Sequence, residues 1–80
     1  MTFKRKEEIL TKPVYTHSDV KELSEVGDTR AWEIMKECRS KFGGSLKNND
    51  RGIKAESYWL WQGTTLNEEL RKVAIALYGV

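Results

Sequence analysis

The segment from Ser18 to Phe42 constrains the fold most, because its pattern predicts two short amphipathic helices joined by a tight turn. Apolar residues repeat at i, i+3 and i+6 in the first half, and Gly27 then interrupts the pattern. Asp28 or Thr29 can cap the second helix by accepting from its free backbone N–H groups. Two helices that cross steeply need a small side chain near their closest approach, and Ala31 can supply it. The apolar faces consist of Val20, Leu23 and Val26, then Ala31, Ile34, Met35, Cys38 and Phe42.

Such a pair is typical of a helix-turn-helix, whose second helix enters the DNA major groove. A hairpin signal follows it directly, because Leu46 and Ile53 bracket the turn-forming run of residues 48–52. A β-hairpin in this place is a wing. We therefore expect a mainly α fold with a small β-hairpin, a winged helix-turn-helix.

The remaining segments predict further helices around this unit. Residues 1–12 are expected to form either a frayed helix or a flexible arm, and Pro13 favours an extended segment after them. Residues 54–63 read as a short aromatic helix with one tryptophan in the core. Thr16 or Ser18, with Asp19, can cap the first helix of the pair, and Thr65 with Glu68 can cap a last helix. The core-facing stripe of that last helix consists of Leu66, Leu70, Val73, Ala74 and Leu77.

The length of the chain predicts one small domain over residues 1–80. The net charge is only +2, but residues 1–16 and 41–56 each carry +2 while residues 17–40 carry −2. The two basic segments flank the helix pair, as phosphate contacts require. A single cysteine and the lack of a signal-like or membrane-spanning run favour the cytoplasm.

The outward start of the second helix is the candidate base-reading surface. Arg30 can donate two hydrogen bonds to guanine, Glu33 can accept from cytosine, and Thr29 can touch a thymine methyl or a phosphate. Arg30 and Glu33 could equally be a solvated ion pair, and Trp32 could pack against the wing or lie along the DNA backbone. The candidate residues are Asp28, Thr29, Arg30, Trp32, Glu33 and Lys36.

The hairpin supplies a second set of candidate contacts. Its polar and basic tip suits a minor groove or a phosphate, although the same residues could be present only because they tolerate turn geometry. Two lysines flank the hairpin, where they are expected to reach the phosphates of the DNA backbone. The candidates are Lys47, Asn48, Asn49 and Arg51 at the tip, with Lys41 and Lys54 beside it.

Catalytic and metal-binding patterns are lacking, so we expect no enzyme, cofactor, metal or small-molecule substrate. His17 has no ligand-spaced partners and reads as a local cap or surface residue. Adjacent carboxylates point in different directions on a helix and cannot act as a pair. The chain has no glycine-rich phosphate loop and no nucleophile elbow.

From Thr16 to Lys36 the spacing resembles small excisionases and related winged-helix DNA-binding proteins of phages and integrative elements, and the MerR-like DNA-binding unit. Val20, Leu23, Val26, the turn 27–30, Ala31 and Ile34 fall on the pattern. Gly27-Asp28 stands where Ser-Arg or Ser-Glu is usual, and the last helix is longer than a minimal excisionase requires. The resemblance implies that the protein binds double-stranded DNA as a recombination directionality factor. It also implies that the protein contacts an integrase or associates with further copies of itself on the DNA.

Two alternatives remain open. The same fold could serve a small transcriptional regulator. A protein-interaction module is the third possibility, because residues 17–40 are acidic and three apolar residues of the last helix fall off its core stripe. These three are Ile75, Tyr78 and Val80.

Overall fold

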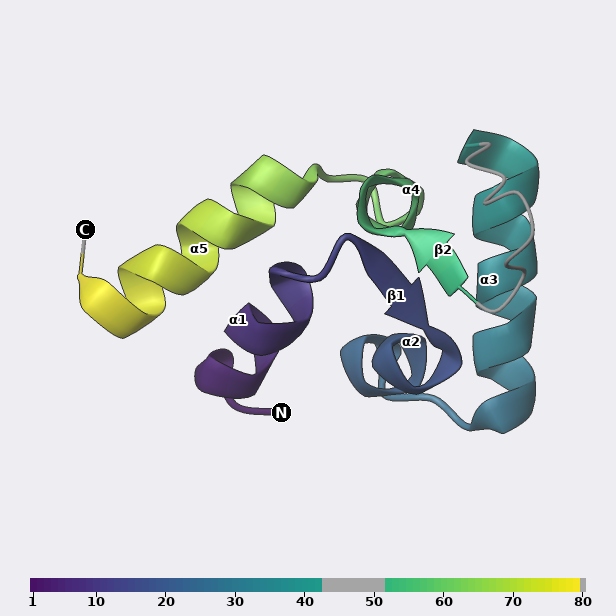
Figure 1. The fold of residues 1–80 in the computed structure, drawn as a ribbon, viewed down its shortest axis with the longest axis horizontal. Helices are drawn as coiled ribbons and strands as arrows, with labels where there is room; N and C mark the ends of the chain where they lie inside the picture. The colour runs from purple at the N-terminus through teal and green to yellow at the C-terminus, as the bar shows by residue number, and fades with distance from the viewer. Residues whose placement is uncertain (43–51, 80) are drawn as a thin grey trace.

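The computed structural model describes residues 1–42 and 52–79 and is mainly helical, with one antiparallel pair of short strands. Figure 1 shows α3 at one end of the molecule and the packed helices α1 and α5 at the other. The strands, α2 and α4 lie between them. The elements are α1 (Phe3–Leu10), β1 (Val14–Thr16), α2 (His17–Ser24), α3 (Asp28–Phe42), β2 (Gly52–Lys54), α4 (Ala55–Trp61) and α5 (Leu66–Tyr78).

The two strands come from distant parts of the sequence. Tyr15 pairs with Ile53 at the centre of the register, so the extended segment predicted after Pro13 is the partner of β2. A Cβ on Gly52 would lie 2.5 Å from Val14 Cγ1, and glycine is therefore needed for this close approach. The described sheet is thus a small antiparallel pair, but it joins β2 to β1, and the predicted hairpin between Leu46 and Ile53 lies mostly outside the described residues.

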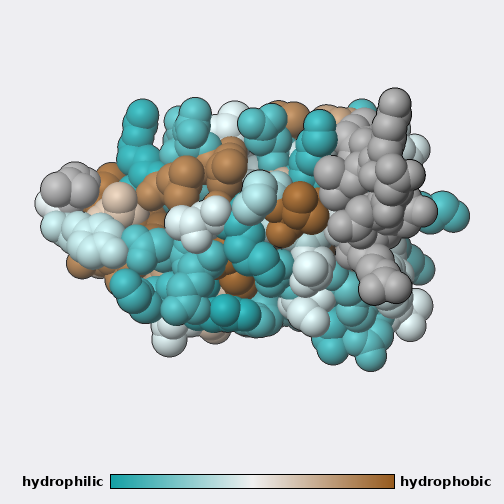
Figure 2. Space-filling view, in the orientation of Figure 1, coloured by the Kyte–Doolittle hydropathy of each residue, from teal (hydrophilic) through white to brown (hydrophobic). Residues whose placement is uncertain are grey.

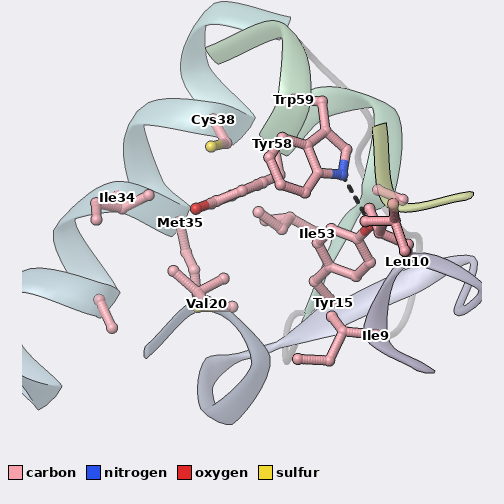
Figure 3. Close-up of a cluster of buried hydrophobic side chains, with 13 residues drawn as sticks. Ile9, Leu10, Tyr15, Val20, Ile34, Met35, Cys38, Ile53, Tyr58 and Trp59 are labelled. Atoms are coloured by element: carbon pink, nitrogen blue, oxygen red, sulfur yellow. Dashed lines mark hydrogen bonds between the residues drawn. The ribbon is translucent and has the colours of Figure 1, made fainter. Parts of the chain in front are cut away.

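Aromatic side chains from β1 and α4 form the centre of the core (Figure 3). Tyr15, Tyr58 and Trp59 meet edge to face, with ring centroids between 4.8 and 6.4 Å apart. The indole N–H of Trp59 donates to the Tyr15 hydroxyl at 2.9 Å, which satisfies a buried donor. The prediction of one core tryptophan in this helix is confirmed by Trp59, whereas Trp61 lies at the edge of the core and donates to Glu37 of α3.

The predicted stripe of α3 faces this core along most of its length. Ala31, Met35 and Cys38 are fully buried and Ile34 nearly so, and burial raises the pKa of the Cys38 thiol to about 11, so this thiol packs as a small hydrophobe. The inward placement of Phe42 was wrong, because burial on α3 stops at Cys38 and leaves Phe42 40% exposed.

The segment left open between a helix and an arm forms α1, and polar contacts tie it to two other helices. Arg5 donates to both carboxylate oxygens of Glu22 on α2, at 2.8 and 2.9 Å. The Lys6 ammonium lies 3.0 Å from the buried Glu69 carboxylate of α5. Ile9 and Leu10 at the end of α1 are buried in the core. These contacts fix α1 between α2 and α5.

Predicted capping residues begin α2 and α5. Thr16 and Asp19 form a reciprocal capping box, and Thr65 accepts from the backbone N–H of Glu68. Gly63 follows α4 with a φ of 88°, a left-handed conformation that favours glycine. On α5, Val73 is buried while the other stripe residues are partly buried against the core or beside it.

The carboxylate of Asp19 is buried and makes three contacts that favour its charged form. Burial alone would raise its pKa, but the Lys12 ammonium at 2.6 Å and the Thr16 backbone N–H and hydroxyl together hold the pKa below its usual value of 3.8. A carboxyl whose pKa is lowered on folding stabilises the fold above its unfolded pKa. This stability is lost as pH falls through the folded value.

We therefore expect the free energy of unfolding to drop as the pH falls below about 4. Urea unfolding at about pH 5 and about pH 3 measures the drop in the wild type and in Asp19→Asn, which cannot titrate at this position. The variant should lose less stability over the interval, and equal losses would show that Asp19 does not carry the effect. Glu69, whose pKa is also lowered, contributes equally to the loss of stability in the wild type and in Asp19→Asn.

Candidate nucleic-acid interface

The predicted turn between α2 and α3 is present, and its left-handed residue is Glu25. Glu25, with φ 53° and ψ 50°, follows α2 in the left-handed conformation, whereas Gly27 needs no positive φ. The Gly27 carbonyl accepts from the Ala31 N–H at 3.0 Å and so begins α3. The prediction that Asp28 or Thr29 caps this helix was therefore wrong, because both already lie in its first turn.

Residues of α3 opposite the buried stripe form an open surface, here called the α3 outer face. It consists of Thr29, Trp32, Glu33, Lys36 and Ser40, which follow helical spacing and are all exposed. The fully buried Ala31 brings α2 close to the opposite side of α3. Figure 1 shows α3 at one end of the molecule, and the side chains of its outer face are exposed.

Two of the predicted base-reading residues are engaged with each other and a third is engaged with α2. Arg30 Nη1 lies 3.4 Å from Glu33 Oε1, and both side chains are at least half exposed. Such an exposed pair is weak and opens at little cost when a better partner arrives. Asp28 is bound more closely, because its carboxylate lies 2.7 Å from the Lys21 ammonium.

His17 and Trp32 form a stacked pair at the junction of α2 and α3. Their ring centroids are 4.2 Å apart and their planes are inclined by 21°. The Nε2 atom of His17 is 3.0 Å from the Asp28 carbonyl, which can only accept, so Nε2 carries the proton. Trp32 therefore packs on His17 of α2. The predicted contact with the wing tip falls on residues outside the described ranges, and contact with DNA stays a prediction.

Exposed lysines without a carboxylate partner occur on α3 and at the end of β2. Within residues 1–42 and 52–79, seven lysines and arginines make ion pairs: Lys4, Arg5, Lys6, Lys12, Lys21, Arg30 and Lys72. Over the same residues Lys36, Lys41 and Lys54 are exposed and make none. We call these three the free lysines. Arg71 is the one further cation in this state, and it lies on α5, at the opposite end of the molecule from α3.

The base of the predicted wing is held against α3. Arg39 Nη2 donates to the Gly52 carbonyl at 3.0 Å, which joins α3 to β2. Lys54, at the end of the same strand, is exposed. The predicted tip residues Lys47, Asn48, Asn49 and Arg51 lie outside the described residues.

Sequence reasoning did not foresee the roles of His17 and Arg39. Both act through contacts between separate elements, His17 with the carbonyl of Asp28 and Arg39 with that of Gly52. Helical periodicity assigns residues to faces of one helix and carries no signal for such contacts. For this reason, the lone His17 was predicted to be a local cap or a surface residue.

Apolar surface also occurs away from α3. In Figure 2 it runs along α5 towards the start of β1, between hydrophilic side chains. A shallow hollow there is lined by Pro13, Val14, Lys54, Ala55, Glu56 and Leu66. It gathers one lysine and one glutamate with apolar groups, which gives it no nucleophile with an adjacent base.

Other kinds of site find no support in the described parts of the chain. Residues 1–42 and 52–79 bring together no three His, Cys, Asp or Glu side chains able to hold a metal ion. No helix among them has the length and apolar character needed to cross a bilayer. Comparison with family models, with curated proteins and with solved structures finds no match to this chain.

Proposed function

We propose that this protein binds double-stranded DNA as a winged helix-turn-helix, with the α3 outer face in the major groove and β2 at the base of a wing. The observation that carries the proposal is the position of the free lysines. Within residues 1–42 and 52–79, seven cations are engaged with carboxylates, whereas Lys36 and Lys41 on α3 and Lys54 at the end of β2 are exposed without such a partner. Unpaired cations beside an exposed helix face suit a polyanion.

Contacts within the proposed interface divide into two classes. The free lysines would neutralise phosphates and position the protein without reading sequence. Thr29, Arg30 and Glu33 would read base edges once the exposed Arg30–Glu33 pair opens. Lys47, Asn48, Asn49 and Arg51 belong to the proposed wing tip on sequence grounds alone.

A salt titration of duplex binding tests this function. Fluorescence anisotropy with a labelled duplex of mixed sequence, from about 50 to 200 mM salt, gives the slope of log affinity against log salt. Neutralising three phosphates predicts a slope of about −3 or steeper. Affinity that does not change with salt, or no binding at about 50 mM, would contradict the proposal.

A role as an excisionase of a mobile element is the finer proposal, and it rests on the resemblance of residues 16–36. Footprinting on the DNA next to the gene separates the possibilities. Protection of repeats at an attachment site supports excision together with an integrase, and protection of a promoter operator supports a transcriptional regulator.

A second candidate function is a protein-interaction module. It is favoured by Ile75 and Tyr78 on α5, which are 52% and 58% exposed. Large apolar side chains at such exposure suit a partner surface, such as a recombinase or a second copy of the chain. The salt titration discriminates, because an apolar contact depends weakly on salt.

A further inference from the structure

Trp32 differs from the other two tryptophans in the state of its indole N–H. Trp59 donates to the Tyr15 hydroxyl and Trp61 donates to the Glu37 carboxylate, each at 2.9 Å. Within residues 1–42 and 52–79 the Trp32 N–H has no hydrogen-bond partner, and the side chain is 50% exposed. An indole N–H can only donate, so its natural complement is an acceptor supplied from outside.

The ring of Trp32 is nevertheless held in place. His17 stacks against one side of the indole, with centroids 4.2 Å apart. The imidazole is itself fixed, because Nε2 donates to the Asp28 carbonyl at 3.0 Å and its side chain is only 20% exposed. A large exposed side chain would otherwise move among rotamers and lose that freedom on binding.

The surroundings of the indole indicate which acceptor suits it. Lys36 lies one helical turn further along α3, on the same face and without a carboxylate partner in the described residues. The Asp28 carboxylate close to His17 is already engaged by Lys21 at 2.7 Å. A donor beside an unpaired ammonium complements the phosphate oxygens of one DNA strand.

We propose that His17 is a positioning residue that holds the Trp32 indole so that its N–H donates to a phosphate oxygen of bound DNA. The inference rests on the proposed function, since it assumes that the α3 outer face meets a duplex. In this inference the donor to the phosphate is the uncharged indole N–H of Trp32. Such a contact adds affinity but, unlike a lysine contact, releases no counterion.

Three variants separate the parts of this contact. Trp32→Phe keeps a stacking ring and removes the donor, so binding of a mixed-sequence duplex should weaken about tenfold with an unchanged salt slope. His17→Phe keeps a stacking ring and should bind within about twofold of the wild type. His17→Gln keeps an N–H donor for Asp28 but has no ring, and its affinity should fall about fivefold.

Anisotropy across salt measures each affinity and slope, and circular dichroism at the assay temperature verifies that each variant is folded. Wild-type affinity in Trp32→Phe overturns the inference while the wild type itself still binds. Equal affinities of His17→Phe and His17→Gln overturn the positioning role. If the wild type fails to bind the duplex, the proposed function is wrong and the inference falls with it.

Discussion

Replacing Lys36, Lys41 and Lys54 together by glutamine should lower the affinity for duplex DNA about a hundredfold or more at roughly 0.1 M salt. Each lysine that neutralises one phosphate contributes about 0.9 to the slope of log affinity against log salt. The slope should therefore become shallower by about 3. All three side chains are exposed and have no carboxylate partner in the described residues, so the change removes no internal contact there.

A matched control with the same loss of charge is available at the opposite end of the molecule. Lys4, Arg71 and Lys72 lie on α1 and α5, away from α3 (Figure 1). Changing these three to glutamine should leave the salt slope within about 0.5 of the wild type. Equal losses in the two triple variants would mean that net charge, and not the position of the free lysines, governs binding.

Trp59→Ala should have the largest effect on stability, a loss of about 3–5 kcal/mol. The side chain is 5% exposed, packs edge to face on two tyrosines, and donates to the Tyr15 hydroxyl. Its removal leaves a cavity where β1 and α4 meet. Since small domains are only marginally stable, a loss of this size is expected to unfold much of the population.

Urea unfolding measures this effect, with Trp59→Phe as the milder variant that still fills most of the space. Trp32→Ala is the matched control, because Trp32 is 50% exposed, and it should change the free energy of unfolding by less than about 0.5 kcal/mol. A Trp32→Ala chain as unstable as Trp59→Ala would contradict the placement of the core.

Features that depend on local spacing were predicted correctly from the sequence. The Thr16–Asp19 capping box joins residues three apart, and the stripe through Ile34 and Cys38 repeats within one helix. The exposure of Thr29, Arg30 and Glu33 follows from the same periodicity. Helical geometry alone fixes these relations, so the pattern carries them.

Features that depend on distant contacts were not predicted. The partner of β2, the His17–Trp32 stack and the link from Arg39 to Gly52 each join separate elements. The turn before α3 was predicted, but the residue that takes its left-handed conformation was not, because glycine favours that conformation and the chain places Glu25 there. Propensity at one residue yields to the path that packing imposes on the whole turn.

The pairing of β1 with β2 has a consequence for how this chain reaches its native state. All of α2 and α3 lies between the two strands in the sequence, so Tyr15 and Ile53 can meet only after a long loop closes. Closure costs conformational entropy before the strands gain any contact, and such non-local pairing slows folding. We therefore expect the rate-limiting folding step of this mostly helical chain to be the pairing of β1 with β2.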